Sequence, residues 1–381
     1  MWQRWRNITL QVASHKHSNG KPSNSIREGC FMPQTQNRSV MLWLFVFAGL
    51  VAFLVVFGGF TRLTRSGLSI VEWNPVHGAF PPIGEEAWLR EFELYRQTPE
   101  YQLVNKGMTL EAYKGIFYIE WFHRQIARFA GLFYAIPVFY FLFKGFIPRR
   151  EFGIYFVMGM LFIGQAFMGW FMVASGLVDR PAVSHIRLTM HLFLALSLFG
   201  LSLWVAFGHY FGFQKTGVKA KWSPLSKLAI GSMAVLLVQI AYGGFTAGLK
   251  AGHVSSTWPL MFGRLIPPGL FTSVIDLIES PQTVAFIHRW FAFAVLLAVV
   301  WLYFVARQAG YGRDILNGLL ALIGLGIAQI TLGVLVVVFY VPISLALAHQ
   351  AMALVLFALS IYFIHRLRAL DNTRAGQALH A

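Results

Sequence analysis

Long segments without a charged side chain constrain this chain more than any other feature of its sequence. A helix needs about 20 apolar residues to cross a lipid bilayer. Four segments reach that length with no Lys, Arg, Asp or Glu: residues 39–61, 152–178, 188–214 and 228–249. A fifth charge-free segment, residues 315–365, is long enough for two crossings, with Pro342 at the natural break between them.

Two further apolar segments, residues 117–143 and 284–306, complete a set of eight predicted membrane helices. Of the 381 residues, 57% are hydrophobic and 12% are charged, and the mean hydropathy is +0.59. This composition excludes an ordinary soluble domain. The sequence therefore predicts an all-α integral membrane protein with eight transmembrane helices.

The positively charged residues predict the orientation of these helices. With the N-terminus in the cytoplasm, the inward segments hold 18 Lys and Arg and the outward segments hold 10. Because cytoplasmic loops are enriched in Lys and Arg, both termini are predicted to be cytoplasmic. The same bias explains most of the net charge of +16, which therefore does not indicate a nucleic-acid partner. Residues 1–38 fit a cytoplasmic tail, and a mitochondrial targeting segment is the alternative.

Motifs of the first half of the chain recur in the second half. They are Gly58-Gly59-Phe60-Thr61 with Gly243-Gly244-Phe245-Thr246, His123-Arg124 with His288-Arg289, Gln165 with Gln329, Gly169 with Gly333, and His191 with His349. Each half contains four predicted helices, so both copies enter the membrane in the same direction. The sequence therefore predicts a parallel repeat of two four-helix bundles, related by an axis along the membrane normal.

This repeat divides the chain into predicted units. In order they are a cytoplasmic tail (1–38), the first bundle (39–209), a cytoplasmic linker (210–227), the second bundle (228–368) and a C-terminal tail (369–381). The longest outer loop, residues 61–116, belongs to the first bundle. Within it, Trp88, Phe92 and Tyr95 form one face of a predicted helix over residues 85–96. That helix either packs on the outer mouth of the bundle or forms a lid over a hydrophobic ligand.

Four histidines lie in predicted helices two, four, six and eight: His123, His191, His288 and His349. Each is four to six residues from the outer end of its helix, which places all four roughly 6–9 Å deep. Two facing helices of a bundle can each supply one imidazole to a planar cofactor, and haem iron accepts such ligands. The pattern predicts one bis-histidine haem site in each half. The alternative, hydrogen-bonded packing residues, leaves the shared depth unexplained.

Charged neighbours of these histidines differ between the two halves. Arg124, Arg128 and Arg289 lie near the right depth to pair with haem propionates. For Arg124, an ion pair with Glu120 four residues earlier is an alternative. Glu120 shares a helix face with His123, where it could move protons or stabilise a developing positive charge. Because Ala285 stands at the matching position of the second half, the first half is predicted to be reactive and the second to hold its haem.

At these positions the chain resembles a known family. The similar segments are residues 59–69, Glu72-Trp73, Pro81-Pro82, Glu120-x-x-His123-Arg124, Arg187-Leu188-x-x-His191 and His349-Gln350. As a set, over residues 40–368, they are similar to haem A synthases of the proteobacterial and mitochondrial type. The resemblance implies an oxidoreductase that converts haem O into haem A, by two hydroxylations of the C8 methyl group and loss of water to give a formyl group.

The resemblance also assigns roles to the candidate residues. It implies a resident haem B on His288 and His349, with Arg289 nearby. It implies that His123 and His191 hold haem O and then haem A, and that Glu120 takes part in catalysis. From position alone, Arg124 and Arg128, together with Arg62 and Arg65 of the first outer loop, are expected near substrate propionates. Some family members carry a cysteine pair in an outer loop, which the single Cys30 of this chain does not supply.

The family further implies a location and partners. The bacterial inner membrane is expected, with the mitochondrial inner membrane as the alternative. Haem O synthase and cytochrome oxidase assembly factors are the expected partners, and the electron donor and oligomeric state stay open. Two other functions are alternatives: a quinol-linked di-haem b-type electron-transfer protein, and a transporter with inverted repeats. The shared depth of the four histidines disfavours the first, and the parallel repeat disfavours the second.

Overall fold

The computed structural model describes residues 37–73, 77–177, 181–211 and 221–380 of the chain. Eight of its helices are long and apolar enough to cross a membrane, as the sequence predicts. They are α1 (Arg38–Leu63), α4 (Leu110–Phe143), α5 (Phe152–Ala174), α6 (His185–Phe211), α7 (Pro224–Gly248), α9 (Pro281–Gln308), α10 (Arg313–Val338) and α11 (Ile343–His380). The shorter helical elements are η2 (His77–Ala79), α2 (Glu85–Arg96), α3 (Pro99–Leu103), η3 (Arg149–Glu151), η4 (Ala251–His253) and α8 (Asp276–Glu279).

Local sequence signals set where the long helices begin. The side chain of Asn37 accepts hydrogen bonds from the amides of Ser39 and Val40 at the start of α1. Thr109 caps α4 in the same way, and Ser223 and Ser280 cap α7 and α9, each followed by proline at the first helical position. A capping side chain satisfies backbone amides that have no partner within the helix, and proline fits there because it has no amide hydrogen to satisfy.

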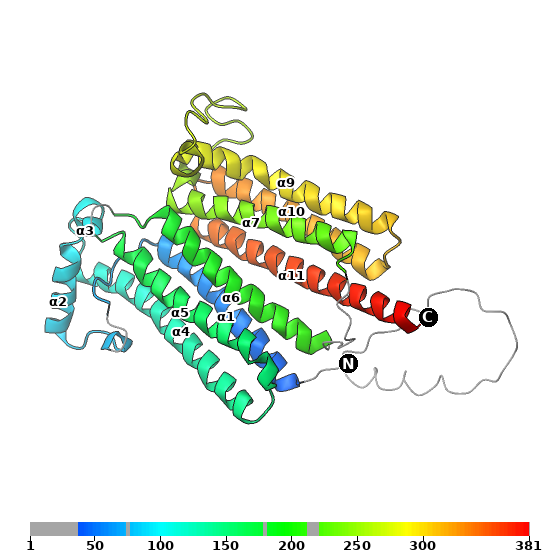
Figure 1. Ribbon diagram of the computed structural model, residues 1–381. Helices are drawn as coiled ribbons and strands as arrows, with labels where there is room; N and C mark the ends of the chain where they lie inside the picture. Colours follow the sequence, from blue (N-terminus) through cyan, green and yellow to red (C-terminus); the bar gives the residue numbers. More distant parts are fainter. Residues whose placement is uncertain (1–36, 74–76, 178–180, 212–220, 381) are drawn as a thin grey trace, which may run out of the picture. The chain divides into compact units, whose positions relative to one another are not determined.

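The eight long helices pack as two groups (Figure 1). In the first group, α1 contacts α4 and α6, and α5 contacts α4 and α6. In the second group, α7 contacts α9 and α11, and α10 contacts α9 and α11. The two groups meet where α6 contacts α7 and α11, and where α1 contacts α11. Two clusters of buried apolar side chains hold the helices together: one around Phe47, which extends from the first group to α7 and α11, and one around Leu319 in the second group.

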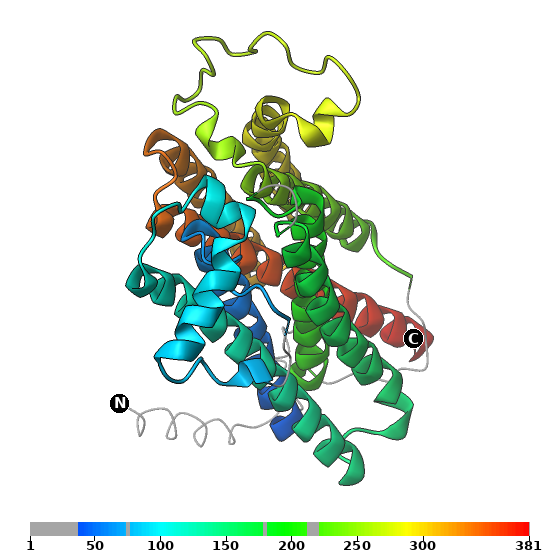
Figure 2. The same ribbon diagram turned by 90° about the vertical axis from the view of Figure 1, so that its left-hand side faces the viewer.

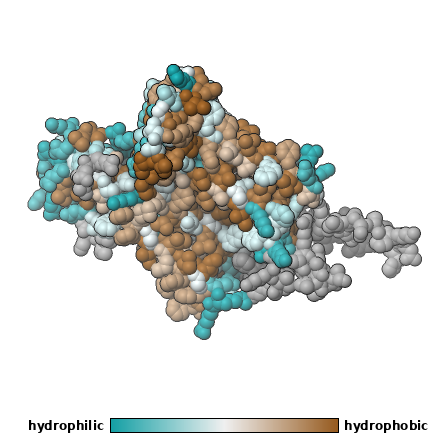
Figure 3. All heavy atoms as spheres, turned by 45° about the horizontal axis from the view of Figure 1, so that its top comes forward, coloured by the Kyte–Doolittle hydropathy of each residue, from teal (hydrophilic) through white to brown (hydrophobic). Residues whose placement is uncertain are grey.

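The flanks of the long helices are apolar, as a lipid-facing surface requires. Figure 3 shows hydrophobic side chains covering these flanks, with hydrophilic side chains gathered mainly at the ends of the molecule. Large side chains such as Phe143, Ile136 and Leu297 are between 66% and 88% exposed along them. Exposure of this kind fits helices whose surroundings are hydrocarbon rather than water.

The long loop of the first half folds back on α4, and α2 and α3 lie in front of the helix ends in Figure 2. Trp88, Phe92 and Tyr95 are buried against Tyr113 and Phe117 of α4. Of the two alternatives for this aromatic stripe, the structure favours the packed helix, because the stripe is used in contacts with α4.

Two element boundaries extend beyond the segments expected from the sequence. Helix α4 begins at Leu110, about two turns before the predicted span, and these turns carry the aromatic residues that contact α2. Helix α11 continues to His380, through the segment expected to be a tail. Asp371, on this continuation, accepts hydrogen bonds from the amide of Ser223 and the hydroxyl of Ser226 and so joins α11 to the start of α7. Most of the expected N-terminal tail and linker, residues 1–36 and 212–220, lies outside the described residues.

Candidate functional site

His288 on α9 and His349 on α11 face each other inside the second helix group. The centres of their imidazole rings are 6.3 Å apart and the ring planes are inclined at 83°. The Nδ1 atom of His349 is buried without a hydrogen-bond partner. Two imidazole rings at this separation, one of them with a buried nitrogen that has no hydrogen-bond partner, are suited to share a ligand between them.

His123 on α4 and His191 on α6 form the corresponding pair in the first helix group. They are near enough to interact electrostatically, and the Nδ1 atom of His191 is buried without a hydrogen-bond partner. The ring of Phe57 on α1 stacks on His123, with centres 6.1 Å apart. The structure therefore brings the four predicted histidines together as two pairs, one in each helix group.

Glutamine side chains contact three of the four imidazoles. The Nε2 atom of Gln165 lies 3.2 Å from Nε2 of His191, and that of Gln329 lies 3.4 Å from Nε2 of His349. Nε2 of Gln239 lies 3.2 Å from Nδ1 of His288 and donates to the backbone carbonyl of the same residue at 3.0 Å. At the repeat offset of 185, the residue matching Gln239 is Leu54. His123 is therefore the one histidine of the four without the matching glutamine.

A glycine on a neighbouring helix lies against each imidazole. A methyl group added to the glycine would come within 3.0–3.3 Å of a ring atom in all four cases: Gly58 at His123, Gly169 at His191, Gly243 at His288 and Gly333 at His349. Contacts this short require the ring to move. The recurring glycines therefore create the space in which the histidine side chains lie.

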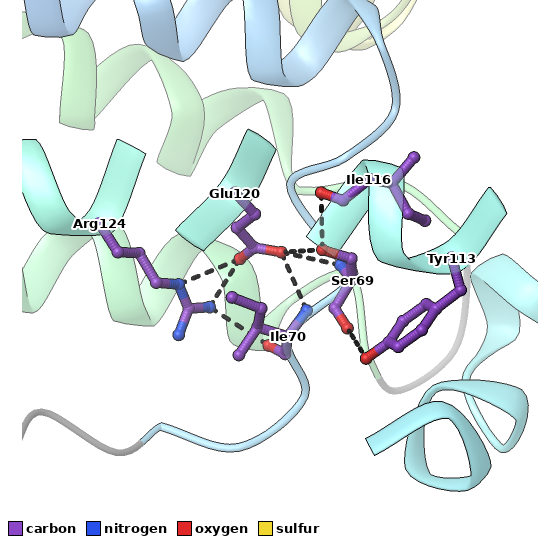
Figure 4. A network of polar contacts seen from close by, with 6 residues as sticks. All are labelled: Ser69, Ile70, Tyr113, Ile116, Glu120 and Arg124. Carbon is purple, nitrogen blue, oxygen red and sulfur yellow. Dashed lines mark hydrogen bonds and ion pairs between the residues drawn. The ribbon is translucent and has the colours of Figure 1, made fainter. Parts of the chain in front are cut away.

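Glu120 on α4 is a buried carboxylate that holds the loop after α1 (Figure 4). Its Oε2 atom accepts hydrogen bonds from the amide of Ser69 at 2.8 Å, the hydroxyl of Ser69 at 2.8 Å and the amide of Ile70 at 2.9 Å. Its Oε1 atom accepts from Nε and Nη2 of Arg124 at 3.2 and 2.6 Å. Tyr113 extends the network, because its hydroxyl donates toward the carbonyl of Ser69 at 3.2 Å.

Arg124 and Arg289 hold matching loops in the two halves. Nη2 of Arg124 donates to the carbonyl of Ile70 at 3.2 Å. Nη2 of Arg289 donates to the carbonyl of Ser255, which matches Ile70 at the offset of 185, and its Nη1 donates to Thr257. The ion pair with Glu120, given above as an alternative for Arg124, is present. Both guanidinium groups thus bind loop carbonyls in the described structure.

Arg128 and Arg62, which are also expected near propionates, have protein contacts of their own. Nη1 of Arg128 donates to Oε1 of Gln125 at 2.9 Å. Nη1 of Arg62, at the end of α1, donates to the carbonyl of Ala247 at the end of α7, at 2.8 Å. Arg65 adopts a positive φ of 55° at the turn after α1. Arg62 thus links the two helix groups.

Sequence reasoning left several of these residues without a role. The repeat includes Gln165, Gln329 and the glycines, and the family resemblance includes Ser69, but the sequence gives none of them a role, and it does not single out Gln239 or Ile70. The repeat itself carries a usable signal, because residues retained at matching positions beside the histidines contact them. No signal in the sequence indicates that Ser69 and Ile70 bind Glu120, because backbone amides are present at every residue except proline.

The arrangement of these residues limits the kind of metal ligand that the histidine pairs could hold. Across the described part of the chain, no cluster of three or more His, Cys, Asp or Glu could hold a bare metal ion. Two imidazoles inside an apolar helix bundle instead suit a metal that brings its own equatorial ligands, as haem iron does. One pair has a carboxylate three residues before its first histidine, and the other pair has Ala285 there.

Comparison with known proteins identifies relatives over most of the chain. The chain is 42% identical to a protein named heme A synthase from Parvibaculum lavamentivorans over 339 residues, covering 87% of this chain and 95% of the relative. It is 43% identical to heme A synthase from Caulobacter vibrioides, covering 89% and 98% of the two chains. Residues 41–361 match the model of the COX15-CtaA family, described as cytochrome oxidase assembly protein. The chain belongs to the COX15-CtaA family.

Proposed function

We propose that this multi-pass membrane protein is a haem A synthase, an oxidoreductase that converts haem O into haem A. The C8 methyl group of the substrate is hydroxylated twice, and the resulting geminal diol loses water to give the formyl group. Relatives with this name, about 40% identical over most of the chain, support the assignment. The membrane-spanning helices supply the apolar setting that a farnesylated porphyrin needs, and their two histidine pairs supply ligands for iron.

In this proposal, His288 and His349 hold a resident haem B. The observation that carries the assignment is the 6.3 Å separation of their ring centres. A metal bonded to an imidazole nitrogen at about 2 Å on each side places two ring centres about 6 Å apart. Arg289 keeps the neighbouring loop in place through its carbonyl contacts. Once bound, haem B supplies a one-electron redox centre.

His123 and His191 hold the iron of the substrate haem. Glu120 is the residue that separates this pair from the other, since Ala285 occupies the matching position. A fixed negative charge there can stabilise positive charge that develops on the substrate during oxidation. Proton transfer, the other predicted role, would require Glu120 to release one of its five hydrogen bonds, so we favour the electrostatic role.

Arg124 and Arg128 belong to the same proposed substrate site. Arg124 orients Glu120 through two nitrogens and fixes the loop at Ile70. Arg128 lies one turn further along α4. We propose that substrate propionates meet the edges of these guanidinium groups, since arginine binds carboxylates well where water is scarce.

The proposed architecture is a parallel repeat with both termini in the cytoplasm, in a bacterial inner membrane. The matching contacts of Arg124 and Arg289 and the matching glycines support the repeat. Both relatives named above come from bacteria, which favours the bacterial membrane over the mitochondrial one. Haem O synthase and cytochrome oxidase assembly factors are the proposed partners.

Pigment analysis tests the function and the two sites together. The protein is expressed with and without a haem O supply, and its extracted haems are separated by chromatography. We expect haem A only when haem O is supplied and Glu120 is intact, and haem B in both cases. His288→Ala should remove the resident haem B, whereas His123→Ala should remove haem A and leave haem B. A protein that binds two haem B groups and never forms haem A would instead be an electron-transfer cytochrome.

A further inference from the structure

Two adjacent glycines near the end of α1 lie beside the two histidine pairs, one against His123 and the other against the residue that follows His349. Gly58 lies against His123 of its own helix group, where an added methyl group would meet Nε2 at 3.3 Å. Gly59 faces the other helix group, where an added methyl group would meet Oε1 of Gln350 at 2.0 Å. Gln350 directly follows His349 on α11. Residues next to each other in α1 therefore contact one histidine of the first pair and the neighbour of a histidine of the second.

A hydrogen bond fixes Gln350 at this contact. Its Nε2 atom donates to the carbonyl of Val55 on α1 at 2.8 Å, across 295 residues of sequence. The amide of Gln350 therefore occupies the space that a side chain at residue 59 would fill. A side chain at residue 59 would displace this amide, which is the far end of a flexible side chain, and would break its hydrogen bond to Val55.

The second half repeats the same contact in the opposite direction. Gly243 lies against His288, where an added methyl group would meet Cε1 at 3.3 Å. Gly244 faces α6 of the first group, where an added methyl group would meet Oγ1 of Thr189 at 2.5 Å. Thr189 is two residues before His191. The first helix of each group thus contacts the helix that carries the second histidine of the other group.

We propose that Gly59 with Gln350, and Gly244 with Thr189, are positioning contacts. Each fixes the position of a histidine pair from the opposite helix group. This inference rests on the haem sites of the proposed function. Gly58 and Gly243 provide space for the histidine of their own group. Gly59 leaves room for the amide of Gln350, and Gly244 lies directly against Thr189, each on the fourth helix of the other group. A change at Gly59 therefore acts on the haem of the second group, although Gly59 belongs to the first.

The test measures one haem at a time. In a His123→Ala/His191→Ala background, His288 and His349 are the pair left to bind haem, and haem loss is followed by transfer to excess apomyoglobin. We expect Gly59→Ala to speed haem loss about tenfold, in line with mutations that disturb the support of a metal ligand. The largest g value of the low-spin ferric signal, which depends on the angle between the imidazole planes, should shift as well.

Gly49→Ala is the matched control, because residue 49 lies on the same helix with no atom within 4 Å of an added methyl group. Gln350→Met removes the hydrogen bond without adding a side chain to α1, so it tests the contact even if Gly59→Ala fails to fold. Haem loss and g values that stay the same in Gly59→Ala and Gln350→Met would overturn the inference. A parent background that binds no haem would overturn the assignment of His288 and His349, on which the inference rests.

The reciprocal experiment uses a His288→Ala/His349→Ala background. There, Gly244→Ala should speed haem loss from His123 and His191, and Gly231→Ala, whose added methyl group has no atom within 4 Å, should leave it unchanged. Haem loss from His123 and His191 that is the same in Gly244→Ala as in Gly231→Ala would contradict the crossed arrangement.

Discussion

Glu120 binds Ser69 twice, through the backbone amide and through the side-chain hydroxyl, each at 2.8 Å. The two residues are separated by 51 positions, so this contact fixes where the chain returns after α1. Because Glu120 lies three residues before His123 on α4, the position of the loop and the position of the imidazole are linked through one turn of helix.

Removing the Glu120 carboxylate should damage both stability and activity. Glu120→Ala leaves Arg124 and the amides of Ser69 and Ile70 without their acceptor. Breaking a buried ion pair by removing one partner costs about 3–5 kcal/mol. We expect a lower unfolding temperature in detergent and at least about 100-fold less haem A formed, with Glu120→Gln between Glu120→Ala and the unchanged protein.

Glu111→Gln is the control on the same helix, because the Glu111 side chain is 81% exposed and pairs with Lys114 at the surface. This substitution should change the free energy of unfolding by less than about 0.5 kcal/mol. Full activity in a folded Glu120→Ala protein would contradict the role assigned to this residue.

Replacing Arg289 by lysine should loosen the loop that follows α7. Arg289 donates to the carbonyls of Ser255 and Thr257 through two different nitrogens, and one ammonium group lacks the planar fork that reaches both. We expect faster limited proteolysis within residues 254–275 and a loss of about 1–2 kcal/mol of stability. Arg307→Lys, at an exposed position of α9, should behave like the unchanged protein. Equal proteolysis of both variants would show that the contacts of Arg289 with the loop carbonyls do not stabilise the loop.

Exchanging the residues at positions 54 and 239 should change how firmly the two haems are held. Gln239→Leu removes the amide that contacts His288, and changes beside a metal ligand cost about 10–100-fold in affinity. Leu54→Gln introduces an amide at the matching position near His123 and should slow the release of haem A. Haem transfer to apomyoglobin measures both effects, and Leu54→Met serves as the control. Faster release from Leu54→Gln would contradict this expectation.

Alkaline pH should weaken the packing of α2 through Tyr95. Burial raises the pKa of Tyr95 to about 12, against an ordinary value of 10. Because the folded state binds this proton more tightly, the stabilising contribution is complete below pH 10 and is lost as the pH rises from 10 to 12. Unfolding followed at pH 9, 10 and 11 should show a steeper loss of stability for the unchanged protein than for Tyr95→Phe. Parallel loss in both proteins would show that Tyr95 does not cause it.

The length of the charge-free and apolar segments predicted all eight membrane helices, because hydrocarbon leaves a spanning chain few alternatives to the helix. The aromatic stripe from Trp88 to Tyr95 correctly predicted α2, since its spacing fits only one face of a helix. The ends of the helices were less predictable. Helix α4 begins at Leu110 because Thr109 caps it, and the extra turns are stabilised by contacts with a distant loop, which no local window contains.

At the candidate site, the pairing of the histidines could be predicted from the repeat. The loop carbonyls that bind the neighbouring arginines could not. That His288 faces His349 could be expected from their matching depth in two neighbouring helices. The loop carbonyls that bind Arg124 and Arg289 could not, because every residue offers a carbonyl and only the folded loop selects Ile70 and Ser255. The sequence favoured propionates as the partners of these arginines, since it shows charged side chains but not backbone geometry.

The aromatic residues under α2 form a hydrophobic core of their own, separate from the one around Phe47. Residues 77–109 thus form a small module that rests on the extended end of α4 and is joined to the Glu120 network through Tyr113. A module with its own core can be exchanged between relatives while the helices beneath it stay the same. A chimaera that replaces residues 77–109 and keeps Ser69, Ile70 and Tyr113 should therefore retain the fold and the chemistry of the bundle.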